Sequence, residues 1–364
     1  MYAAGERSAD MLYFSGLQTP DPIFAFTNKG KKYGLLSSLE SGRAKKYSTL
    51  DEIIEISEVC KLAKITYSDI GALKVILKKN RIKALTIPAD FPAKIYAELQ
   101  ANGFDINIAD ATIFPARRVK TNTELKEIRK ANSVAAAGFT IAEEILRSSE
   151  IKSGKLYYNN QPLTSNFIRA EIEKTALSLG ADSMNTIVAS GNSACDPHDC
   201  GNGVIMANSM IVIDIFPRLK SSGYYGDMTR TFLKGKPTSA QIKIVEAVLA
   251  AQALALSEIK AGVDGAIVHK SVVDFFDKNG FKTYADKRGW HGFFHSTGHG
   301  LGLDVHESPS LGMRKSILEV GNVVTVEPGL YYKGIGGCRI EDNVVVTKTG
   351  VKMLSEYHYE WIIP

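Results

Sequence analysis

Four acidic residues interrupt apolar, strand-like segments in the second half of the chain. They are Asp214 in MIVIDIF, Asp227 at the start of DMTRTF, Glu327 at the end of VVTVE, and Glu341 in CRIEDNVVV. A single buried carboxylate would be explained by a nearby Lys or Arg, because leaving it unpaired is costly. Four of them in one part of the chain are better explained by one positive partner that they all face. The pattern therefore predicts a metal site built mainly from oxygen ligands.

The Gly- and His-rich segment HSTGHGLGLDVHE can complete that site. It contains His295, His299 and His306, and its glycines allow the backbone to approach neighbouring groups closely. Four carboxylates and one imidazole suit two divalent ions that share bridging carboxylates, a combination typical of hydrolases. Cysteine ligands would instead indicate a closed structural zinc site, but the four cysteines form no CxxC pair.

The alternation of strand-like and helical segments in residues 1–115 predicts a small α/β domain before these motifs. The segments MLYFSGL and PIFAFT are expected to be strands, as are KALTIP and FDINIAD. Helices are expected over 68–80, which Asn80 closes, and over 91–103, where Asn102-Gly103 forms the C-terminal cap. The domain boundary is expected near Pro115.

Residues 116–364 predict a larger domain in which helices lead into paired strands. Thr121 and Glu124 form the pattern of a capping box at the start of a long helix. Further helices are expected over 164–179 and, as a pair, over 239–279. The segments MIVIDIF and GYYGDMTRTFLKG are expected to pair as a hairpin.

Length and composition exclude several other classes of protein. A chain of 364 residues with 45% hydrophobic and 23% charged residues predicts two globular domains. Its net charge of +5, without runs of like charge, argues against nucleic acid as a partner. The first residues lack the pattern of a signal peptide, and the run VLAAQALALSEI is too short to span a membrane. We expect a cytoplasmic protein with free thiols that does not bind membranes.

Taken together and in this order, these motifs resemble those of the pita-bread metallopeptidases. IDIF with GDMTRTF, then STGHGLGLDVHE, VEPGLY and RIED are similar to motifs of aminopeptidase P, prolidase and, more distantly, methionine aminopeptidase. Residues 1–115 resemble the N-terminal domain that the first two share with creatinase. The resemblance implies an α+β protein with a smaller creatinase-like α/β domain at 1–115 and a catalytic pita-bread domain at 116–364. Arg339 favours the Xaa-Pro aminopeptidase and prolidase branch.

The resemblance also implies a role for each site residue. Asp214 would bind one metal ion, Asp227 and Glu341 would bridge, and His299 and Glu327 would bind the other ion. Glu327 would also act as general base, and His198 and His306 would donate a hydrogen bond or move a proton. The proline pocket would be lined by His295, Tyr331 and Arg339, although Arg339 could instead orient Glu341.

The implied cofactors and partners follow from the same resemblance. Two divalent ions are expected, with manganese preferred and cobalt, iron or zinc also compatible. The expected substrates are peptides with proline at the second position, and relatives suggest a homodimer.

Two departures from the family pattern affect these expectations. Phe216 stands where the family often has Gly, which predicts a changed substrate preference, and the Asp214 to Asp227 spacing is two residues longer than usual. Because two is an even number, both aspartates are still predicted to face one side of the hairpin. The alternatives are a non-catalytic peptide-binding module, a member without strict proline preference, and a metal-free amidinohydrolase resembling creatinase. The complete ligand set argues against the first and the third.

Overall fold

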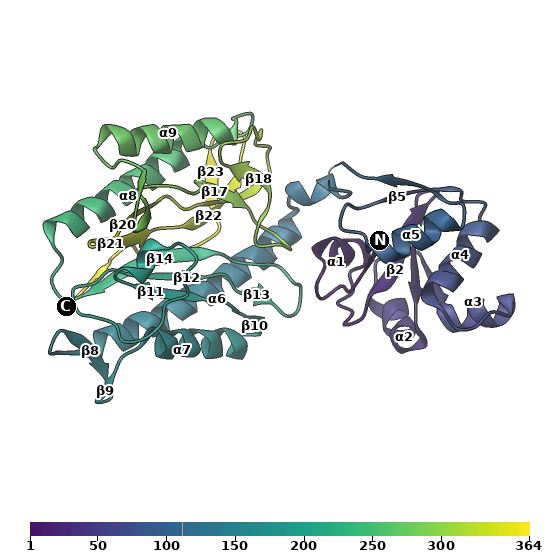
Figure 1. The fold of residues 1–364 in the computed structure, drawn as a ribbon, viewed down its shortest axis with the longest axis horizontal. Helices are drawn as coiled ribbons and strands as arrows, with labels where there is room; N and C mark the ends of the chain where they lie inside the picture. The colour runs from purple at the N-terminus through teal and green to yellow at the C-terminus, as the bar shows by residue number, and fades with distance from the viewer. Residues whose placement is uncertain (111) are drawn as a thin grey trace. The chain divides into compact units, whose positions relative to one another are not determined.

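The structure of the protein is a computed structural model that describes residues 1–110 and 112–364. It divides into an N-terminal unit, Met1–Arg117, and a C-terminal unit, Arg118–Pro364. Each unit combines helices with strands (Figure 1), so the predicted α+β class is confirmed.

The N-terminal unit contains a four-stranded sheet with the order β1-β2-β3-β4, in which β3 and β4 are parallel. A second, parallel pair joins β5 and β6. The strands are β1 (Tyr2–Ala3), β2 (Ile23–Asn28), β3 (Lys31–Leu36), β4 (Glu52–Glu55), β5 (Ala84–Ile87) and β6 (Asp105–Ile108). The helices are α1 (Ala9–Ser15), α2 (Ser38–Tyr47), α3 (Ile56–Ala63), α4 (Asp69–Lys79) and α5 (Ala93–Ala101). The predicted ends of α4 at Asn80 and of α5 at Asn102 are confirmed.

The prediction of a strand over MLYFSGL is wrong, because these residues belong mainly to helix α1. The Ser8 hydroxyl accepts a hydrogen bond from the Met11 amide, and Gly16 ends the helix in the left-handed region with φ of 68°. Met11 and Phe14, one helical turn apart, are both buried in one core cluster. The cap residues Ser8 and Gly16 were the local signals for this helix.

The C-terminal unit contains four long helices and most of the strands. The helices are α6 (Asn122–Arg147), α7 (Ser165–Ser178), α8 (Ser239–Glu258) and α9 (Gly265–Lys278), and the short 3-10 turns are η1 (Pro115–Arg118), at the boundary of the units, and η2 (Ser193–Cys195). The strands in its first half are β7 (Glu150–Lys152), β8 (Lys155–Tyr158), β9 (Gln161–Pro162), β10 (Ala181–Asp182), β11 (Ile187–Ser190), β12 (Ile211–Ile215), β13 (Arg218–Leu219) and β14 (Met228–Lys234). Those in its second half are β15 (Tyr284–Asp286), β16 (Gly289–His291), β17 (Gly298–Gly300), β18 (Glu307–Leu311), β19 (Val323–Val326), β20 (Gly329–Tyr332), β21 (Gly336–Arg339), β22 (Asp342–Val346), β23 (Val351–Met353) and β24 (Ile362–Ile363).

Two helix layers enclose the strands of this unit. Figure 1 shows α6 and α7 on one side of the strands and α8 and α9 on the other. The first pair packs with β11, β12 and β14 in one apolar cluster, and the second pair packs with β19 and β22 in another. The predicted capping box of α6 is confirmed, since Thr121 and Glu124 bond each other's backbone amides. The helices expected over 164–179 and 239–279 are also confirmed.

The hairpin that carries the two aspartates has the expected geometry. Strands β12 and β14 are antiparallel, with Asp214 opposite Thr229 and Ile215 opposite Met228. Directly opposed residues share a face of the sheet, and so do residues two positions apart. Asp227 therefore lies on the same face as Thr229 and Asp214, which confirms the parity expected from the longer spacing.

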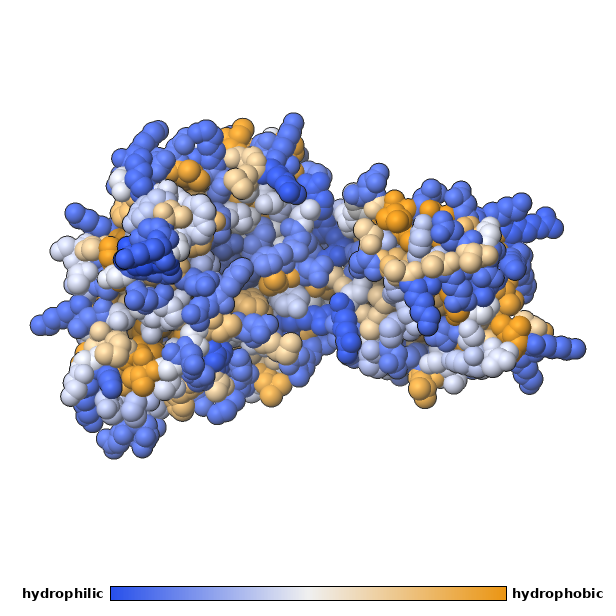
Figure 2. All heavy atoms as spheres, viewed as in Figure 1, coloured by the Kyte–Doolittle hydropathy of each residue, from blue (hydrophilic) through white to orange (hydrophobic). Residues whose placement is uncertain are grey.

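Helix α8 contains the apolar run that was judged too short to span a membrane. The helix itself has 20 residues and is the one helix in the described ranges that is long and apolar enough to do so. This is weak evidence, because buried residues such as Val248, Ala251 and Ala255 pack in the core beside α9. On the face drawn in Figure 2, hydrophilic side chains predominate and apolar residues are scattered.

Candidate metal centre

A cleft of about 720 Å³ in the C-terminal unit brings the predicted site residues together. Nine of the ten contribute to its lining, namely His198, Asp214, Asp227, His295, His299, His306, Glu327, Arg339 and Glu341. The tenth, Tyr331, lies behind this lining and is fully buried. Phe216 also lines the cleft, on the same strand end as Asp214.

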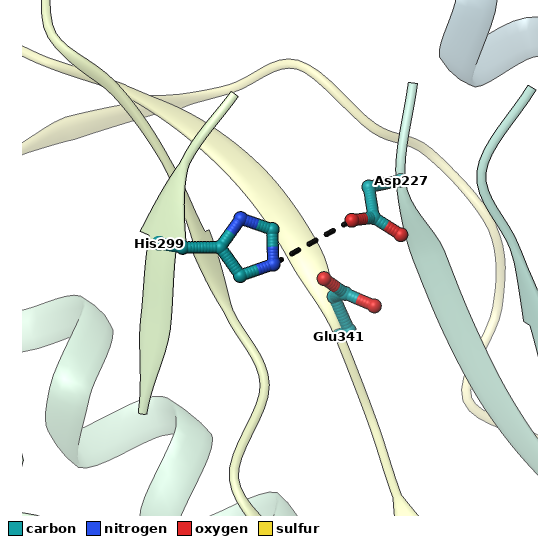
Figure 3. Close-up of side chains that lie close together, drawn as sticks. All are labelled: Asp227, His299 and Glu341. Carbon is teal, nitrogen blue, oxygen red and sulfur yellow. Dashed lines mark ion pairs between the residues drawn. The ribbon is translucent and has the colours of Figure 1, made fainter. Parts of the chain in front are cut away.

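Asp227, His299 and Glu341 form the centre of the site. Their nearest ligand atoms all lie within 4.8 Å of one another. In Figure 3 the His299 ring points between the two carboxylates, with Nε2 3.7 Å from Asp227 Oδ2. The same nitrogen lies 3.3 Å from Glu327 Oε1, so three carboxylates surround the imidazole tip.

The hydrogen bonding of His299 determines what its Nε2 atom can do. His299 Nδ1 lies 3.1 Å from the carbonyl oxygen of Gly300, which can only accept, so Nδ1 carries the proton. In the neutral ring, Nε2 then directs a lone pair toward carboxylate oxygens. Burial lowers the pKa of His299, so a proton at Nε2 is disfavoured. A metal cation would satisfy both the imidazole nitrogen and the carboxylates.

Two glycines explain how β17 brings His299 so close to its neighbours. A Cβ atom on Gly298 would lie 2.0 Å from the carbonyl oxygen of Thr325 on β19. A Cβ atom on Gly300 would lie 2.5 Å from the carbonyl oxygen of Glu307 on β18. Strand β17 therefore fits between β18 and β19 only with glycine on both sides of His299.

The carboxylates of Asp214, Glu341 and Glu327 each have a neighbouring side-chain donor at one of their two oxygens. Arg339 Nη2 donates to Asp214 Oδ2 at 2.8 Å, and the Thr229 hydroxyl donates to Glu341 Oε2 at 2.7 Å. Glu327 Oε1 lies 3.4 Å from the Thr325 hydroxyl. The other oxygens, Asp214 Oδ1 and Glu341 Oε1, are buried and have no hydrogen-bond partner among residues 1–110 and 112–364. Such oxygens are free to bind a cation.

The electrostatics of the cleft also fit a cation. Burial, together with the nearby charges of Glu341, Asp214 and Glu327, raises the pKa of Asp227 well above its usual value. Burial and the charges of Glu327 and Asp214 do the same to the pKa of Glu341. Burial also raises the pKa of Glu327 to about 7, against the opposing effect of Arg339. Divalent ions would offset this repulsion, so the donor set fits the metal centre that the sequence predicted.

A hydrogen-bonded chain connects the predicted proline pocket to Asp214. His295 Nδ1 donates to the carbonyl oxygen of Ser296, so Nε2 accepts from the Tyr331 hydroxyl at 2.8 Å. Arg339 Nη1 donates to Tyr331 Oη at 3.0 Å, while Nη2 of the same residue holds Asp214. Burial and the Arg339 charge lower the pKa of His295 to about 3, so this imidazole is neutral.

His198 and His306 lie on the wall of the cleft, as the sequence led us to expect. The His306 ring is perpendicular to that of His299, with 4.2 Å between ring centroids. Removal from water and the neighbouring His299 lower the pKa of His306 to about 4. A neutral imidazole with this access can donate a hydrogen bond to a bound substrate.

Sequence reasoning missed four polar residues that hold these ligands. Thr229 and Thr325 bond Glu341 and Glu327, and each lies two positions along the chain from a predicted ligand, on the same strand face. The other two, Asn132 and Asn343, contact the backbone of Asp227. A detectable signal was Asn132 itself, a polar residue in the apolar stripe of α6.

Comparison with known proteins identifies the family. The model of metallopeptidase family M24 matches residues 126–348, more than half of the chain. The chain therefore belongs to metallopeptidase family M24, as the motifs suggested. It is 35% identical over 267 residues to a peptidase, YqhT, of Bacillus subtilis, covering 70% of this chain and 69% of that one. It is 32% identical over 287 residues to a Xaa-Pro dipeptidase of Pyrococcus horikoshii, covering 77% of this chain and 75% of that one.

Solved structures share the architecture of both units. An X-Pro aminopeptidase from Thermotoga maritima has a TM-score of 0.83 and 25% identity, covering 100% of this chain and 97% of that one. The prolidase from Pyrococcus horikoshii has a TM-score of 0.81 and 28% identity, covering 98% and 94%. These likenesses confirm the pita-bread fold.

Proposed function

We propose that this metallopeptidase hydrolyses the bond between an N-terminal residue and a proline at the second position of a peptide. The observation that carries the proposal is the cleft in which three carboxylates surround the unprotonated Nε2 of His299. The substrate class is supported by relatives named as Xaa-Pro dipeptidases, including one from Pyrococcus furiosus that is 27% identical over 359 residues.

The same five residues are the proposed ligands of two divalent ions. Asp214 would hold one ion, His299 and Glu327 the other, and Asp227 and Glu341 would contribute to both; manganese is the proposed metal. When bound, such ions polarise a carbonyl oxygen and lower the pKa of water. The buried and otherwise unbonded oxygens of Asp214 and Glu341 support this assignment.

Side chains of the cleft are assigned the proton transfers, the oxyanion hydrogen bond and the substrate contacts. Glu327 is proposed to accept the proton of the attacking water, because its carboxylate lines the cleft beside the tip of His299. His198 and His306 are proposed to donate a hydrogen bond to the oxyanion or to pass a proton to the leaving nitrogen. His295 and Arg339 are proposed to contact the proline-containing part of the substrate.

Tyr331 has a different proposed role from the one its motif suggested. It is fully buried, so its hydroxyl serves to orient His295 and Arg339 rather than to touch substrate. Arg339 lies between Tyr331 and Asp214, so the same side chain can serve both the substrate pocket and a metal ligand.

The proposal extends to the organisation of the protein. We propose that the N-terminal unit is a creatinase-like domain, that the C-terminal unit is the catalytic domain, and that the enzyme is a cytoplasmic homodimer. Support comes from the near-complete coverage of solved Xaa-Pro peptidases, which include both units, and from the composition of the chain.

A direct test is hydrolysis of a Xaa-Pro dipeptide beside a Xaa-Pro-Pro peptide and their Xaa-Ala counterparts. The protein is first stripped of metal with a chelator and then given Mn²⁺ or Co²⁺. We expect metal-restored cleavage of a proline peptide, and the preferred length separates a dipeptidase from an aminopeptidase. Equal cleavage of Xaa-Ala peptides would remove the proline preference. Bound metal without cleavage would indicate a different substrate, as the Phe216 departure predicts, and no bound metal at all would favour the alternative of a non-catalytic peptide-binding module.

A further inference from the structure

Asp227 lies just outside the ladder of backbone hydrogen bonds between β12 and β14. Strand β14 begins at the next residue, Met228, which is opposite Ile215. The peptide groups on both sides of a proposed bridging ligand must therefore find other partners, because buried backbone groups are costly to leave unbonded.

Two asparagine side chains supply those partners. The Asp227 amide donates to Asn132 Oδ1 at 3.0 Å, and the Asp227 carbonyl oxygen accepts from Asn343 Nδ2 at 2.6 Å. Asn343 Nδ2 also donates to Asn132 Oδ1 at 2.8 Å, so both of its protons are used. The two amides and the Asp227 backbone form one closed network, which we call the asparagine clamp.

The clamp is anchored in two different layers of the C-terminal unit. Asn132 lies in the interior of helix α6, and Asn132 Nδ2 donates to the carbonyl oxygen of Leu354 at 3.0 Å. Asn343 lies on β22, the strand that follows Glu341 directly. The clamp therefore connects the strand end that carries Asp227 with the segment that carries Glu341.

The surroundings of the clamp leave little freedom of movement. Asn132 is 2% exposed and Asn343 is fully buried. Gly226 lies so close to α6 that a Cβ atom there would be 2.6 Å from the backbone nitrogen of Asn132. An asparagine inside the apolar stripe of a helix lowers helix propensity and must be desolvated, so a specific contact has to offset that cost.

We propose that Asn132 and Asn343 are positioning residues for the metal centre. By fixing both peptide groups of Asp227, they hold its carboxylate toward His299 and Glu341 before a metal binds. This inference rests on the proposed metal site and adds two residues that contact no substrate. Residues of this kind affect metal affinity by about ten- to hundredfold in other metalloproteins.

The test compares Asn132→Ala with a matched control, Asn322→Ala. Asn322 is also fully buried; its Nδ2 donates to the carbonyl oxygen of Arg118 and its Oδ1 accepts from the Glu319 amide. Both variants lose a buried backbone-bonding amide, so both should unfold at lower temperature. Chelator-treated proteins are titrated with Mn²⁺ by calorimetry, and the visible absorption spectrum is recorded with Co²⁺.

We expect Asn132→Ala to bind at least one Mn²⁺ ion about ten- to hundredfold more weakly and to show an altered Co²⁺ spectrum. Asn322→Ala should match the wild type in both measurements. If Asn132→Ala does not fold, Asn343→Ala removes the other asparagine of the clamp and is expected to weaken Mn²⁺ binding to the same extent. The inference is overturned if a clamp variant binds Mn²⁺ as tightly as wild type, or if Asn322→Ala weakens binding equally. Absence of binding by the wild type would instead refute the proposed metal centre.

Discussion

The two large sheets of the C-terminal unit contribute ligands to one cleft by different structural means. The sheet β11-β12-β14-β24 provides Asp214 from within strand β12 and Asp227 from the residue just before strand β14. The sheet β18-β17-β19-β22-β23 provides His299 beside an irregular register between His299 and Gly300. Glu327 and Glu341 lie just outside its strands. Regular strand pairing therefore places Asp214, whereas Asp227, Glu327 and Glu341 all lie next to strand ends.

The protein also supports the two groups of ligands differently. Asp214 is paired with Arg339, and the backbone of Asp227 is held by the asparagine clamp. Glu327 has a longer contact with Thr325, and His299 Nε2 faces carboxylate oxygens. Protein donors therefore hold Asp214 and the Asp227 backbone, whereas His299 Nε2 and the unbonded oxygens of Asp214 and Glu341 are left for a cation.

The largest expected effect is a loss of catalytic activity, and it tests whether the ligands of both sheets are required. Asp227→Asn and Glu341→Gln keep the side-chain size but remove a charge from each group of ligands. Each should lower kcat/KM by at least about a thousandfold, because metal-based stabilisation of the transition state is lost. Metal content and kcat/KM are measured together. A matched control is Glu143→Gln, a buried carboxylate bonded to Arg147 and Tyr357 outside the cleft; full activity in either ligand variant would contradict the assignment.

A second prediction concerns two of the buried ion pairs of the unit, Arg339–Asp214 and Arg230–Asp342. Arg339→Met leaves Asp214 unpaired and should destabilise the metal-free protein by about 3–5 kcal/mol. Saturating Mn²⁺ should reduce that loss, since the ion replaces the missing positive charge. Arg230 and Asp342 form a buried pair at 2.9 Å that does not line the cleft. Because Arg230 also donates to the carbonyl oxygen of Glu341, Arg230→Met should depend on metal less than Arg339→Met does. Denaturant unfolding of both variants is the measurement, and equal metal dependence would oppose the prediction.

A third prediction concerns how the stability of the metal-free protein depends on pH. The folded pKa of Glu327 is about 7, above the value of 4.5 for an unperturbed glutamate. Its contribution to stability is therefore fully present below pH 4.5 and is lost as the pH rises through about 7. The midpoint temperature should fall by several degrees over this range. Glu327→Gln should make that slope shallower, with the remainder contributed by Asp227 and Glu341, whose pKa values are also raised. An unchanged slope would assign it to other groups.

The smallest expected effect compares the two threonines that bond the ligands. Thr229→Val removes a donor 2.7 Å from Glu341, and Thr325→Val removes one 3.4 Å from Glu327. Because a short bond to a carboxylate contributes more, Thr229→Val should weaken Mn²⁺ binding about tenfold and Thr325→Val about threefold or less. Calorimetric titration of both variants decides the order. The reverse order would mean that Glu327 depends more on its threonine than Glu341 does.

The sequence predicted the site better than it predicted some of the elements around it. Acidic residues inside apolar strands and a glycine-rich histidine segment are visible locally, and strand parity places Asp214 and Asp227 on one face. The Met11–Ser15 segment has the apolar composition of a strand, and the cap residues Ser8 and Gly16, which indicate a helix, were overlooked. The clamp was also missed, because an asparagine 95 residues before Asp227 gives no local sign of its partner. Burial of Tyr331 is likewise a tertiary property.

The separation of the ligands along the chain has a consequence for biosynthesis. Asp214 and Glu341 are 127 positions apart, with two long helices between them. A nascent chain that has released only the hairpin possesses two of the five ligands and cannot assemble the centre. Since an ion that binds only the native state favours that state by mass action, metal uptake would draw the last strands into place. Capture of the ion would then coincide with completion of the fold, and hydrolytic activity would be withheld from every unfinished chain.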